Sequence, residues 1–224
     1  MGVERTRAIV LRRTNYGEAD RILKLLTPFG QASVIARGVR REKSKLAGGI
    51  ELFATSDITI HSGKGELGVL TSARLETFFA HILEDYDRLQ FGYEVINAVS
   101  KASDTINEPA WFDILEQVYK GLNEPNVPMQ LTQVWFYMRY ADLTGYELSL
   151  DRDVSGNKLT SEKSYMYDVS EKGLRPSEQG DILADHIKYL RLIAAKPLLV
   201  VAQIGGVETI LPDCWLLARQ HAQL

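Results

Sequence analysis

The chain has 224 residues, 45% hydrophobic and 25% charged, a balance that excludes wholesale disorder and suits one large domain or two small ones. Its single cysteine, Cys214, excludes an internal disulfide and a multi-cysteine zinc site, and it fits a reducing compartment such as the cytoplasm. The longest uncharged stretch near the C-terminus, residues 197–207, is far shorter than the roughly 20 residues of a membrane span, so we expect no membrane partner.

The net charge of −3 conceals two halves of opposite sign. Residues 1–80 hold 13 basic and 8 acidic side chains, whereas residues 81–224 hold 13 basic and 21 acidic ones. The basic half predicts a polyanionic partner. The acidic half leaves a second interpretation open, in which the chain is a protein–protein adaptor that docks a basic partner.

Residues 6–77 show short apolar or alternating runs separated by turn signals. We expect strands over residues 6–13, 20–27, 31–37, 51–61 and 66–77. Thr27-Pro28-Phe29-Gly30 is typical of a tight turn, and Ser62-Gly63-Lys64-Gly65 is typical of a hairpin. Five short strands without a helical pattern among the first three predict a small closed barrel, which we assign to residues 1–79.

The period changes after residue 79. Apolar residues recur at helical intervals from residue 83 to 99, and further helices are expected from Glu108 and from Pro128 to Gly145. A polar, irregular insertion at about 146–180 precedes a helix over residues 181–195 and a short one from Pro212. We therefore predict an α+β protein, in which an all-helical domain over residues 80–224 follows the barrel.

The sharpest local feature is a run of cations between the third and fourth expected strands. In residues 37–45 these cations are Arg37, Arg40, Arg41, Lys43 and Lys45. A buried strand does not carry such a run, so we predict an exposed loop whose field attracts phosphates. Further cations on the neighbouring strands, which would extend the patch across one barrel face, are Arg12, Arg13, Arg21 and Lys24.

Two aromatic rings occupy turns of the same region. OB-fold barrels bind single strands by combining a charged groove with rings on which bases stack. Tyr16 and Phe29 are therefore candidates for stacking. For Phe29 the alternative is that the ring plugs one end of the barrel.

These segments also carry a family resemblance. Ala8-Ile9-Val10-Leu11, Asn15-Tyr16-Gly17-Glu18-Ala19-Asp20, Leu26-Thr27-Pro28-Phe29-Gly30 and Arg37-Gly38-Val39-Arg40-Arg41 resemble, in order and spacing, the N-terminal pattern of RecO DNA-repair proteins. Leu143-Thr144-Gly145-Tyr146 is similar to a segment that ends a helix in the second domain of that family. The resemblance covers about a third of the chain closely and the remainder in length and layout.

The resemblance implies an OB-fold barrel with a helical domain that binds single- and double-stranded DNA, anneals complementary strands and helps to load recombinase onto DNA coated with single-strand-binding protein. It implies two protein partners, RecR and the acidic C-terminal tail of the single-strand-binding protein, and a nucleoid-associated location in the cytoplasm. Many RecO proteins carry a four-cysteine zinc site after the Gly-Tyr segment. This chain has no cysteine there, so we expect a zinc-free form.

The insertion raises one metal hypothesis. Asp151, Asp153, Ser155 and Glu162 have the spacing of calcium ligands in an EF-hand loop, with Gly156 at the turn. Lys158 stands where such loops carry an aliphatic residue, and the preceding helix ends too early, so an ordinary polar turn is the alternative.

No P-loop or nucleophile elbow is present, and we predict a DNA-binding protein without catalytic residues or cofactor. The sequence does not indicate the oligomeric state, the residues that would contact RecR or the single-strand-binding protein, or a preference between single and double strands.

Overall fold

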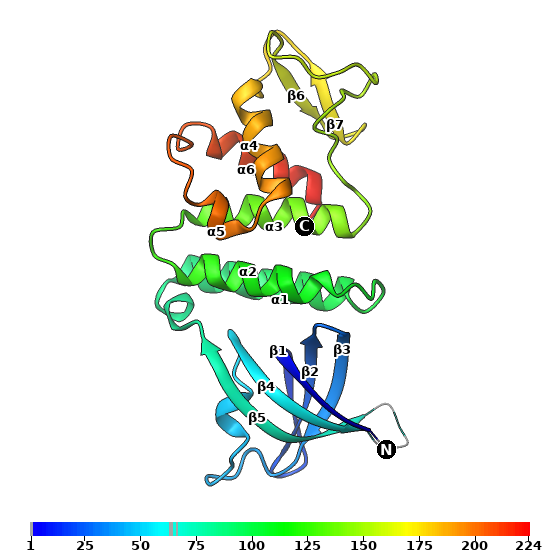
Figure 1. Cartoon of the computed structure of the whole chain (residues 1–224), viewed down its shortest axis with the longest axis vertical. Coiled ribbons are helices and arrows are strands. Elements are labelled where there is room, and N and C mark those ends of the chain that lie inside the picture. The colour runs from blue at the N-terminus through cyan, green and yellow to red at the C-terminus, as the bar shows by residue number, and fades with distance from the viewer. Residues whose placement is uncertain (1, 63–64, 66) are drawn as a thin grey trace. The chain divides into compact units, whose positions relative to one another are not determined.

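The computed structural model describes residues 2–62, 65 and 67–224, and the chain forms two compact units, Met1–Asn123 and Glu124–Leu224. The first runs from blue to green in Figure 1, and the second from green to red. The α+β class is confirmed, because a strand-rich half precedes a helical one. The last barrel strand ends at Phe78, and the first compact unit continues through two helices to Asn123. Within the described residues, no helix is long and apolar enough to cross a membrane.

Five strands form a closed barrel in the order β1-β2-β3-β5-β4, as in OB folds. The strands are β1 (Gly2–Tyr16), β2 (Asp20–Thr27), β3 (Gly30–Ala36), β4 (Ala54–Ser62) and β5 (Gly68–Phe78). All neighbouring strands are antiparallel except β3 and β5, which close the barrel through a short parallel pairing of residues 34–35 with 68–69. The predicted hairpin turn at residues 62–65 falls partly on residues 63 and 64, which lie outside the described residues.

The barrel has an apolar interior, supplied by the inward-facing residues of all five strands. Its fully or nearly buried strand residues include Ala8, Val10, Leu23, Leu25, Val34, Ile58, Ile60 and Leu70. A register shift between Val10 and Arg12 interrupts the pairing of β1 with β2, and such bulges increase strand curvature. The long β1 can therefore pair with β4 along its first half and with β2 along its second half.

One end of the barrel is covered by η2 (Ala80–Glu84), α1 (Tyr86–Ala102) and α2 (Ala110–Asn123). Phe53, directly before β4, contacts Tyr93 of α1 and Tyr119 of α2 edge-on, with ring centroids 5.1 and 5.5 Å apart. Asp85 caps α1 by accepting a hydrogen bond from the backbone N–H of Arg88 at 3.0 Å. These contacts explain why the helices after residue 79 belong to the barrel unit.

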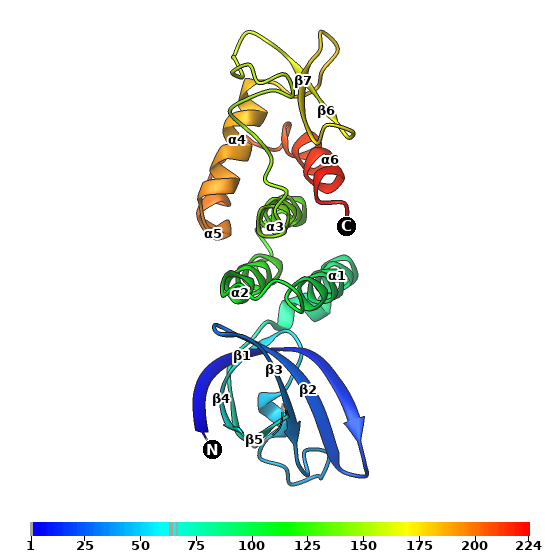
Figure 2. The ribbon, with the colours of Figure 1, turned by 90° about the vertical axis from the view of Figure 1, so that its right-hand side faces the viewer.

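The second unit contains α3 (Met129–Leu143), α4 (Ala184–Ala195), α5 (Leu198–Val201) and α6 (Leu211–Ala222). The insertion is not wholly irregular, because β6 (Tyr165–Asp168) and β7 (Gly173–Pro176) form a two-stranded sheet within it. The prediction of an all-helical second domain therefore needs this correction. Figure 2 shows the hairpin beyond the ends of α4 and α6 within this unit.

Candidate nucleic-acid interface

The loop of residues 37–45, called the basic loop below, is fixed at its start by contacts with the turn between β1 and β2. Gly38 has a φ of +63°, which suits a residue without Cβ, and its N–H donates to the Asp20 carboxylate at 2.7 Å. The backbone N–H of Arg40 donates to the carbonyl of Ala19 at 2.9 Å, and its Nη1 donates to the carbonyl of Gly17 at 3.3 Å. The loop therefore has a defined position beside that turn.

Apolar anchors hold the other side of this segment. Val39 is only 3% exposed, and Ile50, after the basic loop, is only 1% exposed; both join the barrel core, with Leu46 packed against it. Because these residues point inward, the cations between and beside them point into solvent.

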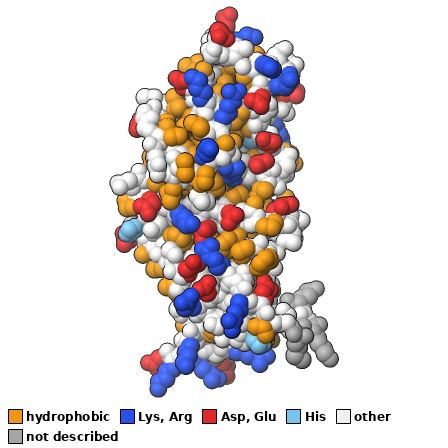
Figure 3. Space-filling view, in the orientation of Figure 1, with side chains coloured by type: hydrophobic (Ala, Val, Ile, Leu, Met, Phe, Trp, Pro, Cys, Tyr) orange, Lys and Arg blue, Asp and Glu red, His pale blue; other side chains and the backbone are white. Residues whose placement is uncertain are grey.

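All five cations of the basic loop, Arg37, Arg40, Arg41, Lys43 and Lys45, are exposed. Among the described residues, no ion pair involves any of them. Figure 3 shows Lys and Arg side chains gathered at the barrel end that lies at the bottom of the view, with fewer acidic ones among them. The loop thus presents unneutralised charge.

The structure places Tyr16 and Arg21 next to the basic loop. Tyr16 ends β1 opposite Asp20, the residue that binds Gly38, and Tyr16 is 55% exposed. Arg21 pairs in register with Ala36, directly before the basic loop, and its Nε donates to Asn15 at 3.2 Å. The cluster formed by Tyr16, Arg21 and the basic loop is the candidate interface.

The remaining predicted cations lie along the strands and differ in their availability. Arg12 is exposed and stands opposite Lys24 in the β1–β2 register. Arg13 forms an ion pair with Glu51 at 2.7 Å, and Lys24 forms one with Asp104 at 2.7 Å. Two of the predicted contacts therefore already have acidic partners.

Phe29 is not part of this cluster. It lies in the turn between β2 and β3, at the opposite end of β2 from Tyr16, and it is 73% exposed. It therefore does not plug the barrel, and that alternative is wrong. Base stacking by Phe29 stays a prediction, at a position away from the basic loop.

Chemically, the cluster suits phosphate rather than base recognition. Guanidinium groups make forked hydrogen bonds to phosphate oxygens, and each neutralised phosphate releases condensed counterions. Contacts to phosphates carry no information about base identity. The exposed Tyr16 ring offers a face on which a base of any kind can stack.

The four residues with calcium-ligand spacing do not converge. Asp151 pairs with Arg191 at 3.4 Å, and one oxygen of Asp153 accepts the backbone N–H of Ser155 at 2.9 Å. The carboxylate of Glu162 instead accepts a hydrogen bond from the hydroxyl of Ser161 at 2.8 Å. Within the described residues, no group of three or more His, Cys, Asp or Glu side chains is placed to hold a metal. We interpret the segment as a polar turn.

Cys214 is unsuited to nucleophilic chemistry. It is fully buried, and burial, with the nearby Asp213 charge, raises the pKa of its thiol to about 12. The reactive thiolate is therefore scarce at neutral pH.

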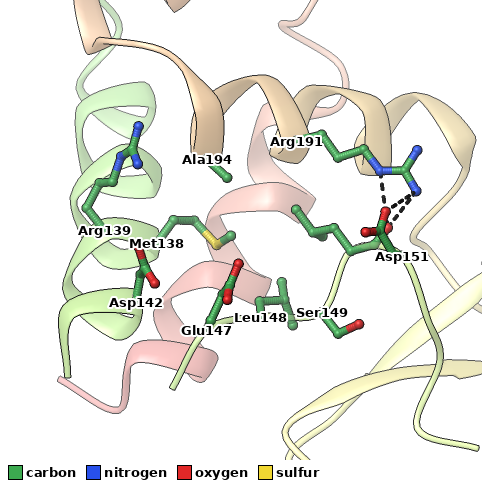
Figure 4. A pocket seen from close by; sticks show the side chains of 10 residues that line it. Met138, Arg139, Asp142, Glu147, Leu148, Ser149, Asp151, Arg191 and Ala194 are labelled. Atoms are coloured by element: carbon green, nitrogen blue, oxygen red, sulfur yellow. Dashed lines mark hydrogen bonds and ion pairs between the residues drawn. The ribbon is translucent and has the colours of Figure 1, made fainter. Parts of the chain in front are cut away.

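Sequence reasoning missed a hollow of about 430 Å³ on the second unit, between α3, the segment after it and α4 (Figure 4), called the α3–α4 hollow below. Its lining includes Met138, Arg139, Leu148, Arg191 and Ala194. Three acidic residues, Asp142, Glu147 and Asp151, also line it. The two arginines stand 52 positions apart in the sequence, and no local pattern links them.

Arg139 is the unusual group of this hollow. Its Nε is buried without a hydrogen-bond partner in the described part of the chain, and burial lowers its pKa. Its guanidinium lies 5.3 Å from the centre of the Trp135 ring. Arg191, in contrast, donates to the Leu150 carbonyl at 2.6 Å and pairs with Asp151. Nη2 of Arg139 donates to the Lys196 carbonyl at 3.4 Å.

A closed five-stranded barrel of OB type with a cation-rich end, followed by a helical half, is an architecture of a kind that occurs among proteins that bind nucleic acids. The model of the family described as "Recombination protein O N terminal" matches residues 1–79, and "Recombination protein O C terminal" matches residues 83–206. The chain belongs to the RecO family of DNA-repair and recombination mediators.

Curated relatives agree with this assignment. A "DNA repair protein RecO" of Roseiflexus sp. (strain RS-1) is 31% identical over 94% of this chain and 75% of its own length. Proteins of the same name from Listeria monocytogenes serotype 4b (strain CLIP80459) and Rubrobacter xylanophilus are 30% and 32% identical. Those two matches cover 67% of this chain, and 59% and 61% of the relatives.

Proposed function

We propose that this protein binds single- and double-stranded DNA through Tyr16, Arg21 and the basic loop, and that it anneals complementary strands during repair on the nucleoid. The observation that carries the proposal is the gathering of five exposed cations, without ion-pair partners in the described part of the chain, beside an exposed tyrosine at one barrel end. The cations offset the repulsion between two phosphate backbones, so that complementary bases can meet. Binding is expected to be insensitive to base sequence.

We also propose that the protein helps to load recombinase onto DNA coated with single-strand-binding protein, and that RecR is its partner. For the acidic tail of the single-strand-binding protein, we propose the α3–α4 hollow as the docking site. Arg139 supplies a half-buried donor, while Met138 and Ala194 supply apolar contact. Asp142 and Glu147 lie at the same hollow and repel the acidic side chains of the tail. We therefore expect only the terminal carboxylate of the tail to lie beside Arg139.

An annealing assay tests the DNA part of the proposal. We expect the triple substitution Arg40→Ala, Arg41→Ala and Lys43→Ala to slow annealing of complementary oligonucleotides about tenfold or more, since three phosphate contacts are lost. The matched control replaces three exposed cations of the second unit, Lys158, Lys163 and Lys196, by alanine. It removes the same charge and should anneal like the unsubstituted chain.

Equal annealing by the two triple variants would refute the assignment of the basic loop. If the unsubstituted chain bound no DNA and annealed no strands, the adaptor interpretation would be preferred.

A peptide-binding assay tests the tail site. We expect Arg139→Ala to weaken binding of a labelled acidic C-terminal tail peptide about tenfold or more, as a charge-assisted hydrogen bond is lost. Lys188→Ala, an exposed cation of α4 outside the hollow, is the control. Anisotropy titrations that give one affinity for both variants would exclude the α3–α4 hollow as the site.

A further inference from the structure

A second set of arginines lies on a different face of the barrel. The outer face of β1, β4 and β5 carries a hollow of about 560 Å³, called the arginine groove below. These three strands pair side by side, β1 with β4 and β4 with β5 (Figure 1). The lining of the groove includes Arg5, Arg7, Asp57, Thr59, Ser72 and Arg74.

The strand register arranges these side chains in two rows. Arg5 pairs with Thr59 and Thr59 with Ser72, which forms one row across the three strands. Arg7 pairs with Asp57 and Asp57 with Arg74, which forms the next row. From the spacing within and between strands, the Cα atoms of the diagonal pair Arg5 and Arg74 lie about 12 Å apart. That distance is about three to four nucleotides of a stacked strand, which rises 3.4 Å per nucleotide.

The groove has more positive than negative charge available to a ligand. Arg5 is exposed, and no ion pair between described residues involves it. Arg74 pairs with Asp57 at 2.5 Å, but its side chain is 80% exposed, and exposed pairs of this kind are weak. Thr59 and Ser72 add hydroxyl donors between the cations. A phosphate backbone can therefore compete for Arg74 while Arg5 binds a second phosphate.

Arg7 has a different role in the same groove. Its guanidinium binds Glu76 at 2.8 Å and Glu116 of α2, and it lies over the Phe112 ring. These contacts fix Arg7 between the barrel and α2, so we assign ligand binding to Arg5 and Arg74.

The groove is separate from the basic loop. Arg5 lies in the part of β1 that pairs with β4, whereas Tyr16 lies at the far end of β1, in the part that pairs with β2 beyond the register shift at Val10. The basic loop adjoins the β1–β2 turn and the end of β3, whereas the groove lies on β1, β4 and β5. It is also away from the β2–β3 face on which OB folds usually bind oligonucleotides.

We infer that the arginine groove binds the phosphate backbone of a second DNA strand while the basic loop holds the first. This inference rests on the proposed annealing function, because annealing requires two polyanions on one protein at the same time. Two separate cationic surfaces hold two strands without forcing their phosphates onto the same cations.

The test counts bound strands on the full chain. Non-complementary thymidine oligonucleotides of about eight nucleotides, within the range of one OB-fold site, are added in two labels. Native mass spectrometry gives the number bound per chain, and anisotropy gives the affinity of each binding step against salt. The variants are Arg5→Ala with Arg74→Ala, the charge-keeping Arg5→Lys with Arg74→Lys, and the control Lys158→Ala with Lys163→Ala.

We expect two oligonucleotides per chain, and we expect the alanine pair to weaken the weaker step about tenfold or more while the tighter step changes less than about twofold. The salt slope of the weaker step should fall by about 1.4 units, twice the roughly 0.7 per contact on single strands. The lysine pair should restore the second step, and the control should match the unsubstituted chain. Annealing should slow only in the alanine pair.

Three outcomes separate the claims. If the alanine pair keeps both steps, the arginine groove is not a DNA site, although the basic loop still can be. If it weakens both steps equally, the two surfaces form one site and the inference is overturned. If the basic-loop triple variant keeps its tighter step, the proposed function itself fails.

Discussion

At the scale of single residues, Gly38 directs the basic loop through its backbone. Its φ of +63° would cost a residue with Cβ about 1–2 kcal/mol, and its N–H binds the carboxylate of Asp20. The loop therefore depends on a glycine and an aspartate eighteen positions apart in the sequence. The resemblance to the family includes both residues, but the contact between them could not be predicted from local patterns.

We expect Gly38→Ala to lower the free energy of unfolding by about 1–2 kcal/mol and to weaken DNA binding, because the cations after it lose their direction. Gly48→Ala is the matched control, since a Cβ there meets open space and its φ lies outside the left-handed region. Denaturant unfolding and anisotropy titration measure the two effects. Identical results for Gly38→Ala and Gly48→Ala would contradict this role.

At the scale of elements, the positions of the barrel strands were largely predictable. Turn residues such as Pro28 and Gly30 separate apolar runs, and β2 has the predicted bounds, 20–27. β1 begins at Gly2 instead of Thr6, because pairing with β4 holds residues that have no apolar alternation of their own. The β6–β7 hairpin was missed because its strands have only four residues each, in polar surroundings.

The candidate interface was only partly predictable, because part of it depends on contacts between residues far apart in the sequence. A run of cations after a strand indicates an exposed loop, and the structure exposes all five. Which ring accompanies them depends on geometry across the barrel, because β2 separates Tyr16 from Phe29. Likewise, the ion pairs of Arg13 and Lys24 join residues 38 and 80 positions apart, which no local pattern shows.

One buried histidine connects elements of the second unit and predicts a pH dependence. In α6, Nδ1 of His221 lies 2.9 Å from the Tyr167 hydroxyl of β6, and Nε2 lies 2.5 Å from the carbonyl of Tyr146. Burial lowers the pKa of His221 from its ordinary value of 6.5, and the positive charge of Lys172 lowers it further. The hydrogen bond to the Tyr146 carbonyl raises the pKa, but it does not offset the other two effects. The folded unit therefore holds the histidine neutral at a pH where the unfolded chain takes up a proton.

Because the unfolded state then binds more protons, this contribution to stability is complete above pH 6.5 and is lost as the pH falls through the lowered value. We expect the unfolding midpoint to fall between about pH 7 and pH 5, and His221→Gln to reduce that dependence while lowering stability at pH 7. Thermal unfolding across this range measures both. A variant with the same pH dependence as the unsubstituted chain would show that another group is responsible.

At the scale of the whole molecule, the opposite charges of the two sequence halves are partly matched within the first unit. Arg7 pairs with Glu116 of α2, and Lys24 pairs with Asp104 in the turn after α1, so the segment after residue 80 neutralises two barrel cations. For Glu116, burial raises the pKa, but hydrogen bonds from Lys120 and Arg7 outweigh burial and leave the pKa lowered. The cations of the basic loop lack such partners among the described residues, so the net positive charge of the barrel is presented there.

The dependence of DNA affinity on salt tests this account most directly. In fluorescence-anisotropy titrations, the logarithm of the binding constant should fall steeply against the logarithm of salt concentration. Replacing Arg40, Arg41 and Lys43 by alanine should reduce that slope by about 2–3 units, while the alanine control at Lys158, Lys163 and Lys196 should leave it unchanged. A slope that stays the same in the basic-loop variant would contradict the basic loop as the surface that contacts DNA.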